Sequence, residues 1–153
     1  MKLIHWCVIG LLLCGCVKPL PGPGPEPIAP PAPIVDPSIV APVGFRALIV
    51  YDTEAANSRE QLAVIYSPKV TEYLNQHCVK DSSGRAEWRR WDKDVQILTT
   101  ESKDVRDLWN AVRPKLGELP QLVLAKDGKA KVYPLPLPED AAMSLITSVA
   151  EAK

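Results

Sequence analysis

Apolar and polar positions follow clear periods over the last two thirds of the chain. Residues 45–51 (FRALIVY) form a short, largely apolar run directly after Gly44. A run of this length, rich in β-branched side chains, is typical of a buried strand. It predicts the first strand of a folded domain.

Two helical segments are predicted next, and each begins at a serine. Ser58 is followed three residues later by Gln61, which is the spacing of a capping box. Ser67 precedes Pro68, and proline is favoured at the first position of a helix. Apolar or aromatic positions then recur at helical spacing: Leu62, Ile65 and Tyr66, followed by Val70, Tyr73, Leu74 and His77. A turn is expected at residues 81–84 (DSSG).

A second strand is expected within residues 86–97, although the stretch WRRWD obscures its period. Ser102 is the expected cap of a further helix, and Pro114 should end or kink that helix near Arg113. The apolar face of this helix would consist of Val105, Leu108, Trp109, Val112 and Leu116.

The last part of the chain predicts a hairpin and a helix. Residues 122–125 and 130–133 form the two strands, and the turn KDGK joins them. A helix with an acidic first turn opens at Pro138, and its apolar face carries Ala142, Leu145, Ile146 and Val149. The order is β-α-β-α-β-β-α, which predicts a three-layer α/β domain. Two right-handed βαβ-type crossovers are expected to make the first strands parallel, with the hairpin as an antiparallel edge.

The N-terminal segment has a different pattern. Residues 3–13 are apolar except for His5 and Gly10. At about 1.5 Å per residue they span roughly 16 Å, which is too short for a hydrocarbon core of about 30 Å. A short apolar run that ends in small residues is typical of a signal peptide.

The segment that closes this run resembles a bacterial lipobox. Leu13 lies at −3, Gly15 at −1 and Cys16 at +1, while Cys14 at −2 departs from the usual residues. The resemblance implies that residues 1–15 are removed, that Cys16 carries the lipid, and that the membrane is one partner. The alternatives are an ordinary secretory signal and an uncleaved anchor. Val17 at +2 is not the aspartate that favours inner-membrane retention, so the resemblance implies the periplasmic face of the outer membrane in a Gram-negative host.

Residues 16–43 are expected to form a disordered, proline-rich linker, which leaves residues 44–153 as the domain. Ten of the sixteen prolines lie here, and Pro19 to Pro42 is expected to form neither helix nor sheet. An extended polyproline-II tether would reach roughly 80 Å at about 3.1 Å per residue.

Charge and cysteine content limit the partners and the thiol chemistry that the chain can have. The chain has 18 basic and 18 acidic residues, a balance that argues against nucleic acid as a partner. If Cys7 and Cys14 leave with the signal and Cys16 is lipidated, only Cys78 remains, and no intramolecular disulfide can form. We expect Cys78 to be buried and inert; a reactive thiol or an intermolecular disulfide is the alternative.

Residues 119–128 (LPQLVLAKDG) are similar to the thioredoxin segment in which a cis-proline opens the third core strand and a Lys-Asp-Gly turn follows. The element order extends this resemblance over most of residues 44–151. It implies a thioredoxin-like fold with Pro120 as the candidate cis-proline; an ordinary trans proline is the alternative. Thioredoxin-like enzymes carry Cys-x-x-Cys after the first strand, but residues 51–58 (YDTEAANS) contain no cysteine. The implied redox activity therefore does not carry over.

Other chemistry is weakly indicated. Asp52 and Glu54 follow the first strand and could line a shallow cleft with residues near Pro120, although solvated loop acids are the simpler interpretation. Neighbouring helical side chains point about 100° apart, so His77 and Cys78 do not form a nucleophile–base pair. Trp88 and Trp91 are expected to pack against helices, and the two arginines between them to pair with Asp92 or Asp94. No phosphate loop or catalytic motif is present, and we expect neither metal nor cofactor.

The sequence therefore predicts a membrane-anchored lipoprotein whose non-redox thioredoxin-like domain is a binding or scaffold module for an envelope protein. The alternatives are an envelope enzyme that uses the loop acids, or a phage-type lysis lipoprotein. Phage outer-membrane spanins resemble residues 1–43, but they lack a folded α/β domain.

Overall fold

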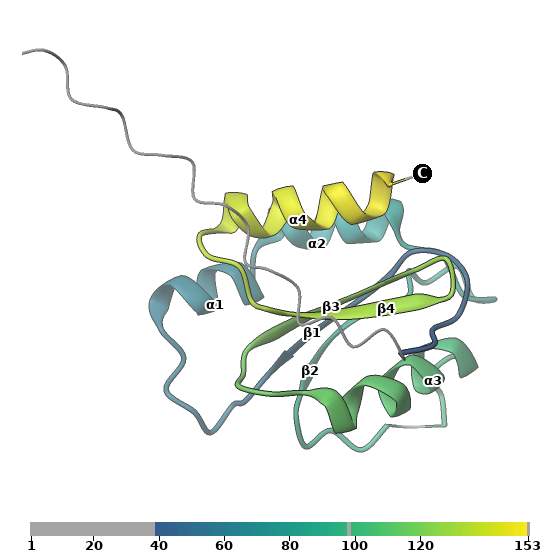
Figure 1. The fold of residues 1–153 in the computed structure, drawn as a ribbon, viewed down its shortest axis with the longest axis horizontal. Helices are drawn as coiled ribbons and strands as arrows, with labels where there is room; N and C mark the ends of the chain where they lie inside the picture. The colour runs from purple at the N-terminus through teal and green to yellow at the C-terminus, as the bar shows by residue number, and fades with distance from the viewer. Residues whose placement is uncertain (1–38, 98, 153) are drawn as a thin grey trace, which may run out of the picture.

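The computed structural model describes residues 39–97 and 99–152, which form a mixed α/β domain (Figure 1). The predicted signal peptide, the predicted lipidation site Cys16 and most of the predicted linker lie outside these residues. The elements are β1 (Arg46–Tyr51), α1 (Arg59–Ile65), α2 (Pro68–His77), β2 (Trp88–Asp92), α3 (Lys103–Val112), the 3₁₀ helix η1 (Arg113–Lys115), β3 (Gln121–Lys126), β4 (Lys129–Pro134) and α4 (Glu139–Glu151). The predicted order of strands and helices is confirmed. No helix among the described residues is long and apolar enough to cross a membrane.

The four strands form one sheet in the order β2-β1-β3-β4. β1 and β2 are parallel, as expected, but β3 runs antiparallel to β1, with Leu48 opposite Val123. The expectation of a second parallel crossover was therefore wrong. The antiparallel direction of β3 follows from the path of the loop after β2. Glu101 in this loop pairs with Arg89 at 2.5 Å, near the start of β2. The loop after β2 has already returned along the sheet, so α3 brings the chain back to the end where β1 finishes.

Helices cover both faces of the sheet, and two apolar clusters result. The helices α1, α2 and α4 cover one face, and α3 covers the other (Figure 1). Successive residues of β1 point to opposite faces: Ala47 and Ile49 join the first cluster, and Leu48 and Val50 join the second. The largest fully buried side chain is Trp109 of α3. The central strands are thus buried on both sides, which explains their nearly continuous apolar sequence.

Local signals at the element ends are confirmed. The Ser58 side chain accepts from the Gln61 N–H and the Gln61 side chain from the Ser58 N–H, so the predicted capping box is present. Ser67 and Ser102 cap α2 and α3 through the N–H groups of the residues three positions on. The β3–β4 turn places Asp127 at φ 52° and Gly128 at φ 81°, which are the left-handed angles of a tight hairpin turn.

The packed domain begins earlier than predicted. Ile39 and Ala41 are buried, whereas Val40 between them is 77% exposed. Val40 forms an antiparallel bridge with Lys129. The Ala130 N–H donates to the Ile39 carbonyl at 3.1 Å, and the Ala41 N–H donates to the Gly128 carbonyl at 3.0 Å. The expectation that the proline-rich segment as far as Pro42 stays out of the sheet was therefore wrong at its last residues. Their apolar–exposed–apolar alternation is that of a strand, and it was hidden by the neighbouring prolines.

Strand β2 lies at the edge of the sheet and is half-buried along its length. Trp91 packs edge-to-face on Trp109 with ring centroids 5.3 Å apart, as expected of a packed tryptophan. The expected pairing of the arginines was wrong, because Arg89 pairs with Glu101 and Arg90 donates to the Ile65 carbonyl. Asp92 is occupied elsewhere: its carboxylate accepts from the Thr53 N–H and hydroxyl and from the Asp94 N–H.

Candidate functional site

The end of β1 and the start of β3 lie side by side, since Val50 is opposite Gln121. Pro120 directly precedes β3, and the Leu119–Pro120 peptide bond is cis. The backbone here is well held: the Pro120 carbonyl accepts from the Leu135 N–H at 3.0 Å. The buried Gln121 side chain accepts from the Gly117 N–H at 3.1 Å. The segment around Pro120 is therefore a fixed part of the surface.

A cleft of about 300 Å³ opens beside Pro120, and we call it the Pro120 cleft. Its lining consists of Gln61, Glu118, Leu119, Pro120, Gln121, Pro134 and Leu135. Proline and leucine side chains line it together with two amides and one carboxylate, and polar atoms make up slightly more of its surface than apolar ones. Within the described residues, no group of three or more His, Cys, Asp and Glu side chains is placed to hold a metal ion.

The helix α1, which contributes Gln61 to the cleft, also carries exposed apolar and aromatic groups. Gln61 lies in the cleft, the next residue Leu62 is 40% exposed, and Tyr66 at the end of the helix is 53% exposed. The Tyr66 ring stacks edge-to-face on Tyr51, with centroids 6.2 Å apart. The Arg90 guanidinium lies 4.6 Å from the centroid of the Tyr66 ring. Tyrosine and arginine are, with tryptophan, the residue types enriched at the energetic centres of protein interfaces.

The sequence reasoning missed this grouping of Tyr51, Tyr66 and Arg90. Tyr66 was assigned to an apolar helix face, and Arg90 was expected to pair with an aspartate. The predicted parallel pairing of β1 with β2 could have indicated this grouping, because it places Tyr51 next to Asp92 and Ile49 next to Arg90. Residues 49, 51 and 90 then share one face of the sheet with the C-terminal end of α1.

The loop acids that follow β1 do not reach the Pro120 cleft. The Asp52 carboxylate accepts from the Glu54 N–H at 2.9 Å, and Lys93 Nζ lies 3.6 Å from the other carboxylate oxygen. Neither Asp52 nor Glu54 lines the Pro120 cleft. The alternative in which these acids and the residues near Pro120 share one cleft is therefore not supported by the structure. Asp52 faces the β2 side of the loop because the turn after β2 brings Lys93 to it.

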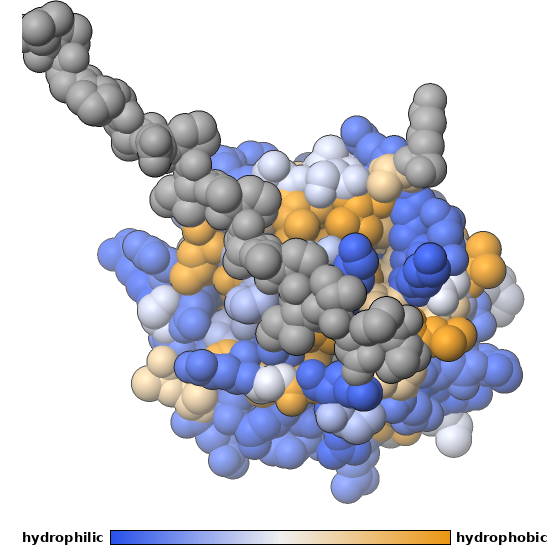
Figure 2. Space-filling view, viewed as in Figure 1, coloured by the Kyte–Doolittle hydropathy of each residue, from blue (hydrophilic) through white to orange (hydrophobic). Residues whose placement is uncertain are grey.

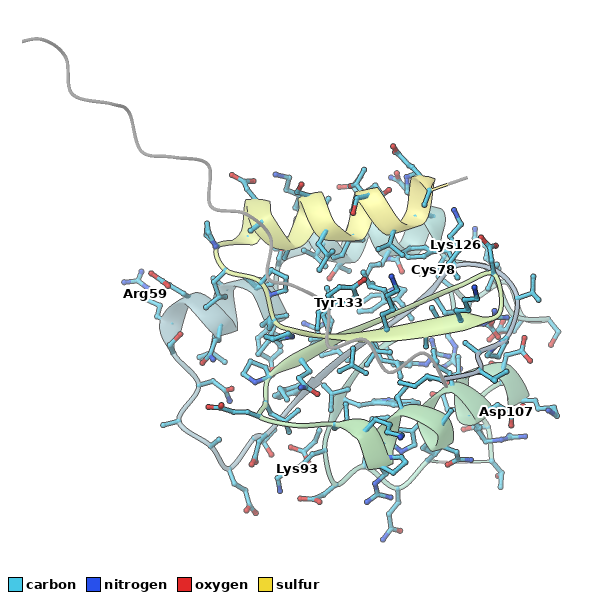
Figure 3. All side chains as sticks on the ribbon, in the orientation of Figure 1. Arg59, Cys78, Lys93, Asp107, Lys126 and Tyr133 are labelled. Atoms are coloured by element: carbon cyan, nitrogen blue, oxygen red, sulfur yellow. The ribbon has the colours of Figure 1, made fainter. Side chains whose placement is uncertain are left out.

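Cys78 is the free cysteine of the described residues, and it is buried, as the sequence predicts. It caps the C-terminal end of α2, and burial raises the pKa of its thiol to about 12. The thiolate that nucleophilic chemistry requires is thus strongly disfavoured. The preceding residue His77 stacks on Tyr73, with ring centroids 4.0 Å apart, so it does not activate the thiol. Figure 3 places Cys78 between the sheet and the α2–α4 layer.

Comparison with known proteins identifies no relative. No family model matches the chain, and no curated protein or solved structure is significantly similar to it.

Proposed function

We propose that this chain is a membrane-anchored lipoprotein that presents a thioredoxin-like domain without redox cysteines as a binding module in the cell envelope. The lipid on Cys16 holds it to the membrane, on the periplasmic face of the outer membrane if the host is Gram-negative. Its partner is an envelope protein, which binds at the Pro120 cleft and the adjoining surface of α1.

The arrangement of the strands supports the thioredoxin-like part of the proposal. A parallel β1–β2 pair comes first, a helix then crosses the other face, and an antiparallel β3–β4 hairpin completes the sheet order β2-β1-β3-β4. Pro120 stands directly before the third strand, where the resemblance puts it. The final helix α4 returns to the face that α1 and α2 cover.

The observation that carries the non-redox part is the absence of a thiol at the end of β1. Residues 52–58 connect β1 to the capping box of α1 and contain no cysteine. Cys78 is at the opposite end of a helix, where the helix dipole disfavours a thiolate, and its pKa is raised to about 12. Exposed Leu62 and Tyr66 next to a loop without cysteine support a binding role over a redox one.

Labelling with radioactive palmitate tests the anchor. We expect the full chain to incorporate label when it is expressed in bacteria, and the Cys16→Ala variant to incorporate none. A Cys7→Ala variant is the matched control, because the proposal assigns it no lipid. Label that persists in Cys16→Ala would show that the anchor has been placed at the wrong residue.

Reduction of insulin disulfides by dithiothreitol tests the non-redox assignment. We expect the purified chain to leave the rate of insulin precipitation at the uncatalysed value. The Cys78→Ala variant should behave identically. Acceleration by the wild-type chain that disappears in Cys78→Ala would contradict the proposal and make Cys78 the reactive thiol.

A further inference from the structure

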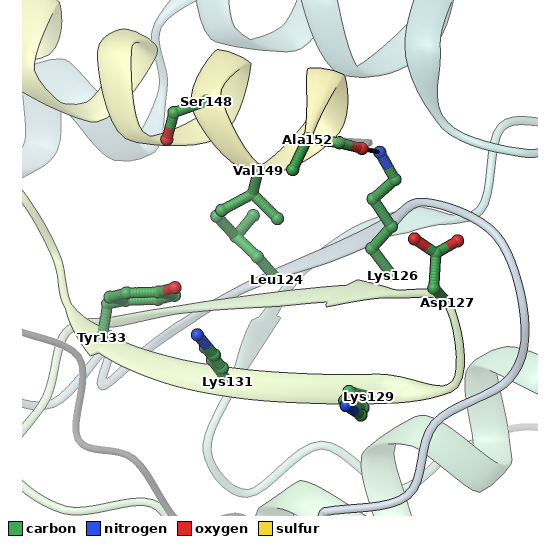
Figure 4. A pocket seen from close by; sticks show the side chains of 9 residues that line it. All are labelled: Leu124, Lys126, Asp127, Lys129, Lys131, Tyr133, Ser148, Val149 and Ala152. Atoms are coloured by element: carbon green, nitrogen blue, oxygen red, sulfur yellow. Dashed lines mark hydrogen bonds between the residues drawn. The ribbon is translucent and has the colours of Figure 1, made fainter.

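A second concave surface lies toward the other end of the β3–β4 hairpin from the Pro120 cleft, between the C-terminal half of α4 and the hairpin. We call this surface the α4–β4 groove; its volume is about 330 Å³. Figure 4 shows Val149 of α4 above Leu124 of β3, with Tyr133 and Lys131 of β4 along the open side. The groove is thus built mainly from three elements of the domain, with Asp127 of the hairpin turn and Ala152 after α4 at its edge.

The floor of the α4–β4 groove is apolar because of the strand alternation. Leu124 and Tyr133 point to the α4 side of the sheet and are almost fully buried. Val149 packs on them from α4 and remains partly exposed. Figure 2 shows hydrophobic side chains gathered along α4 on this face, with hydrophilic ones beside them. The helix therefore covers Leu124 and Tyr133 almost completely, and Val149 is the one of these three apolar side chains that stays partly exposed along the groove.

The rim of the groove is positively charged. Lys126, Lys129 and Lys131 line it, against one carboxylate, that of Asp127. Lys126 is engaged, because its ammonium donates to the Ala150 carbonyl at 2.8 Å and to the Ala152 carbonyl at the end of α4. Lys129 and Lys131 are exposed, and neither forms an ion pair with any of the described residues.

Lysines on an edge strand often serve only to prevent sheet-to-sheet association. That role does not require an apolar groove behind them. An apolar floor with two unpaired cations at its mouth is instead complementary to a molecule that has a hydrocarbon chain and one anionic end. The volume lies at the small end of the range for ligand pockets, about 300–1,000 Å³, which fits one chain better than two.

We propose that the α4–β4 groove binds a long-chain fatty acid. The hydrocarbon chain lies over Leu124, Tyr133 and Val149, and the carboxylate faces Lys129 and Lys131. The proposal is independent of the partner surface at Pro120, and it does not depend on lipidation of Cys16.

Equilibrium dialysis with radiolabelled palmitate tests this site. The full chain is used as the Cys16→Ala variant, so that no covalent lipid competes. We expect saturable binding below the critical micelle concentration, with one palmitate per chain. Lys129→Glu combined with Lys131→Glu should weaken binding at least tenfold. Lys103→Glu on α3, across the sheet, should leave it unchanged.

Two further measurements test the apolar contact and the carboxylate contact separately. Val149→Trp fills the apolar part of the groove without changing charge and should also weaken binding at least tenfold, with thermal unfolding showing that the variant is folded. Hexadecanol, which has the same chain without the carboxylate, should displace palmitate at least tenfold less effectively.

Three results would overturn the assignment. The first is the absence of saturable palmitate binding. The second is binding that the double lysine variant or Val149→Trp leaves intact. The third is binding of anionic two-chain phospholipid vesicles that depends on the two lysines while free palmitate does not bind, which would make this face a membrane contact.

Discussion

At the scale of single residues, Arg46 joins three parts of the chain that are distant in sequence. Its guanidinium pairs with Glu87 and with Asp104, each at 2.5 Å, and donates to the Val43 carbonyl at 2.6 Å. Arg46 and Glu87 are both 4% exposed. A buried pair of this kind adds little net free energy when intact, but removal of one partner strands the other charge.

Replacement of Arg46 by methionine should therefore lower the free energy of unfolding by about 3–5 kcal/mol. Asp104→Asn is the matched control, because the Asp104 side chain is 45% exposed and its loss should cost at most about 1 kcal/mol. Urea denaturation of the three proteins measures both values. Equal losses in the two variants would contradict the expectation that loss of Arg46 leaves the Glu87 carboxylate buried without its ion-pair partner.

Cys78 predicts a dependence of stability on pH. Burial raises the pKa of its thiol from 9.0 to about 12. Below pH 9 the thiol is protonated in both the folded and the unfolded chain, so its contribution is fully present. Between pH 9 and 12 the unfolded thiol has lost its proton while the folded one keeps it. Stability should fall in this window by about 1.4 kcal/mol per pH unit from this group.

Comparison with Cys78→Ala isolates this contribution from those of other titrating groups. The difference in the free energy of unfolding between wild type and Cys78→Ala should shrink by about 1–2 kcal/mol between pH 8.0 and pH 10.5. Urea denaturation at the two pH values gives that difference. A constant difference would show that the thiol titrates near its ordinary pKa in the folded chain.

At the scale of elements, the segment before β1 is held by close packing. Gly44 has φ +101°, and a Cβ there would lie 2.6 Å from Cγ1 of Val79, in the loop after α2. Gly84 in the turn before β2 has φ +81°, and a Cβ there would meet nothing within 4 Å. Both positions favour glycine by their backbone angles, but only Gly44 also requires the close approach.

Alanine at the two glycines should separate these causes. Gly84→Ala should cost about 1–2 kcal/mol from the left-handed backbone alone. Gly44→Ala should cost more, by about 1–3 kcal/mol, because the inserted methyl also displaces Val79. Thermal unfolding of both variants gives the order. A larger loss in Gly84→Ala would contradict the packing described for residues 43–46.

Residues 39–41 offer a second matched pair. Ile39 is 5% exposed and Val40 is 77% exposed. Ile39→Ala should therefore destabilise the domain by about 2–4 kcal/mol, whereas Val40→Ala should change stability by less than about 0.5 kcal/mol. Denaturant titration of the two variants in the full chain measures this. Equal, small effects would show that residues 39–41 are part of the linker and are not packed on the domain.

The elements that the sequence predicted well have local causes. Ser58, Ser67 and Ser102 bond N–H groups only three residues away, and the Asp127–Gly128 turn needs only its own backbone angles. The direction of β3 was missed because a strand buried on both faces has the same apolar pattern in either direction. The partners of Arg89 and Arg46 were missed because they lie 12 and 41 residues away.

At the scale of the whole molecule, two surfaces lie toward opposite ends of the β3–β4 hairpin. The Pro120 cleft is at the end where Gln121 faces Pro134, and the α4–β4 groove extends to the turn where Lys126 faces Lys129. Pro120 was identified from a local resemblance in the sequence. The surfaces themselves could not be: the Pro120 cleft combines Gln61 of α1 with residues 118–135, and the α4–β4 groove depends on how closely α4 packs on the hairpin.

The central claim is that the anchored domain binds an envelope protein through the Pro120 cleft and α1. Photo-crosslinking in intact cells tests it directly, with a benzoylphenylalanine residue placed at position 66 of the full chain. Position 107 is the matched control, because Asp107 lies on α3, across the sheet (Figure 3). The account predicts a discrete crosslinked product from position 66 that is absent from position 107 and lost in the Cys16→Ala chain. The same product from both positions, or none from position 66, would contradict it.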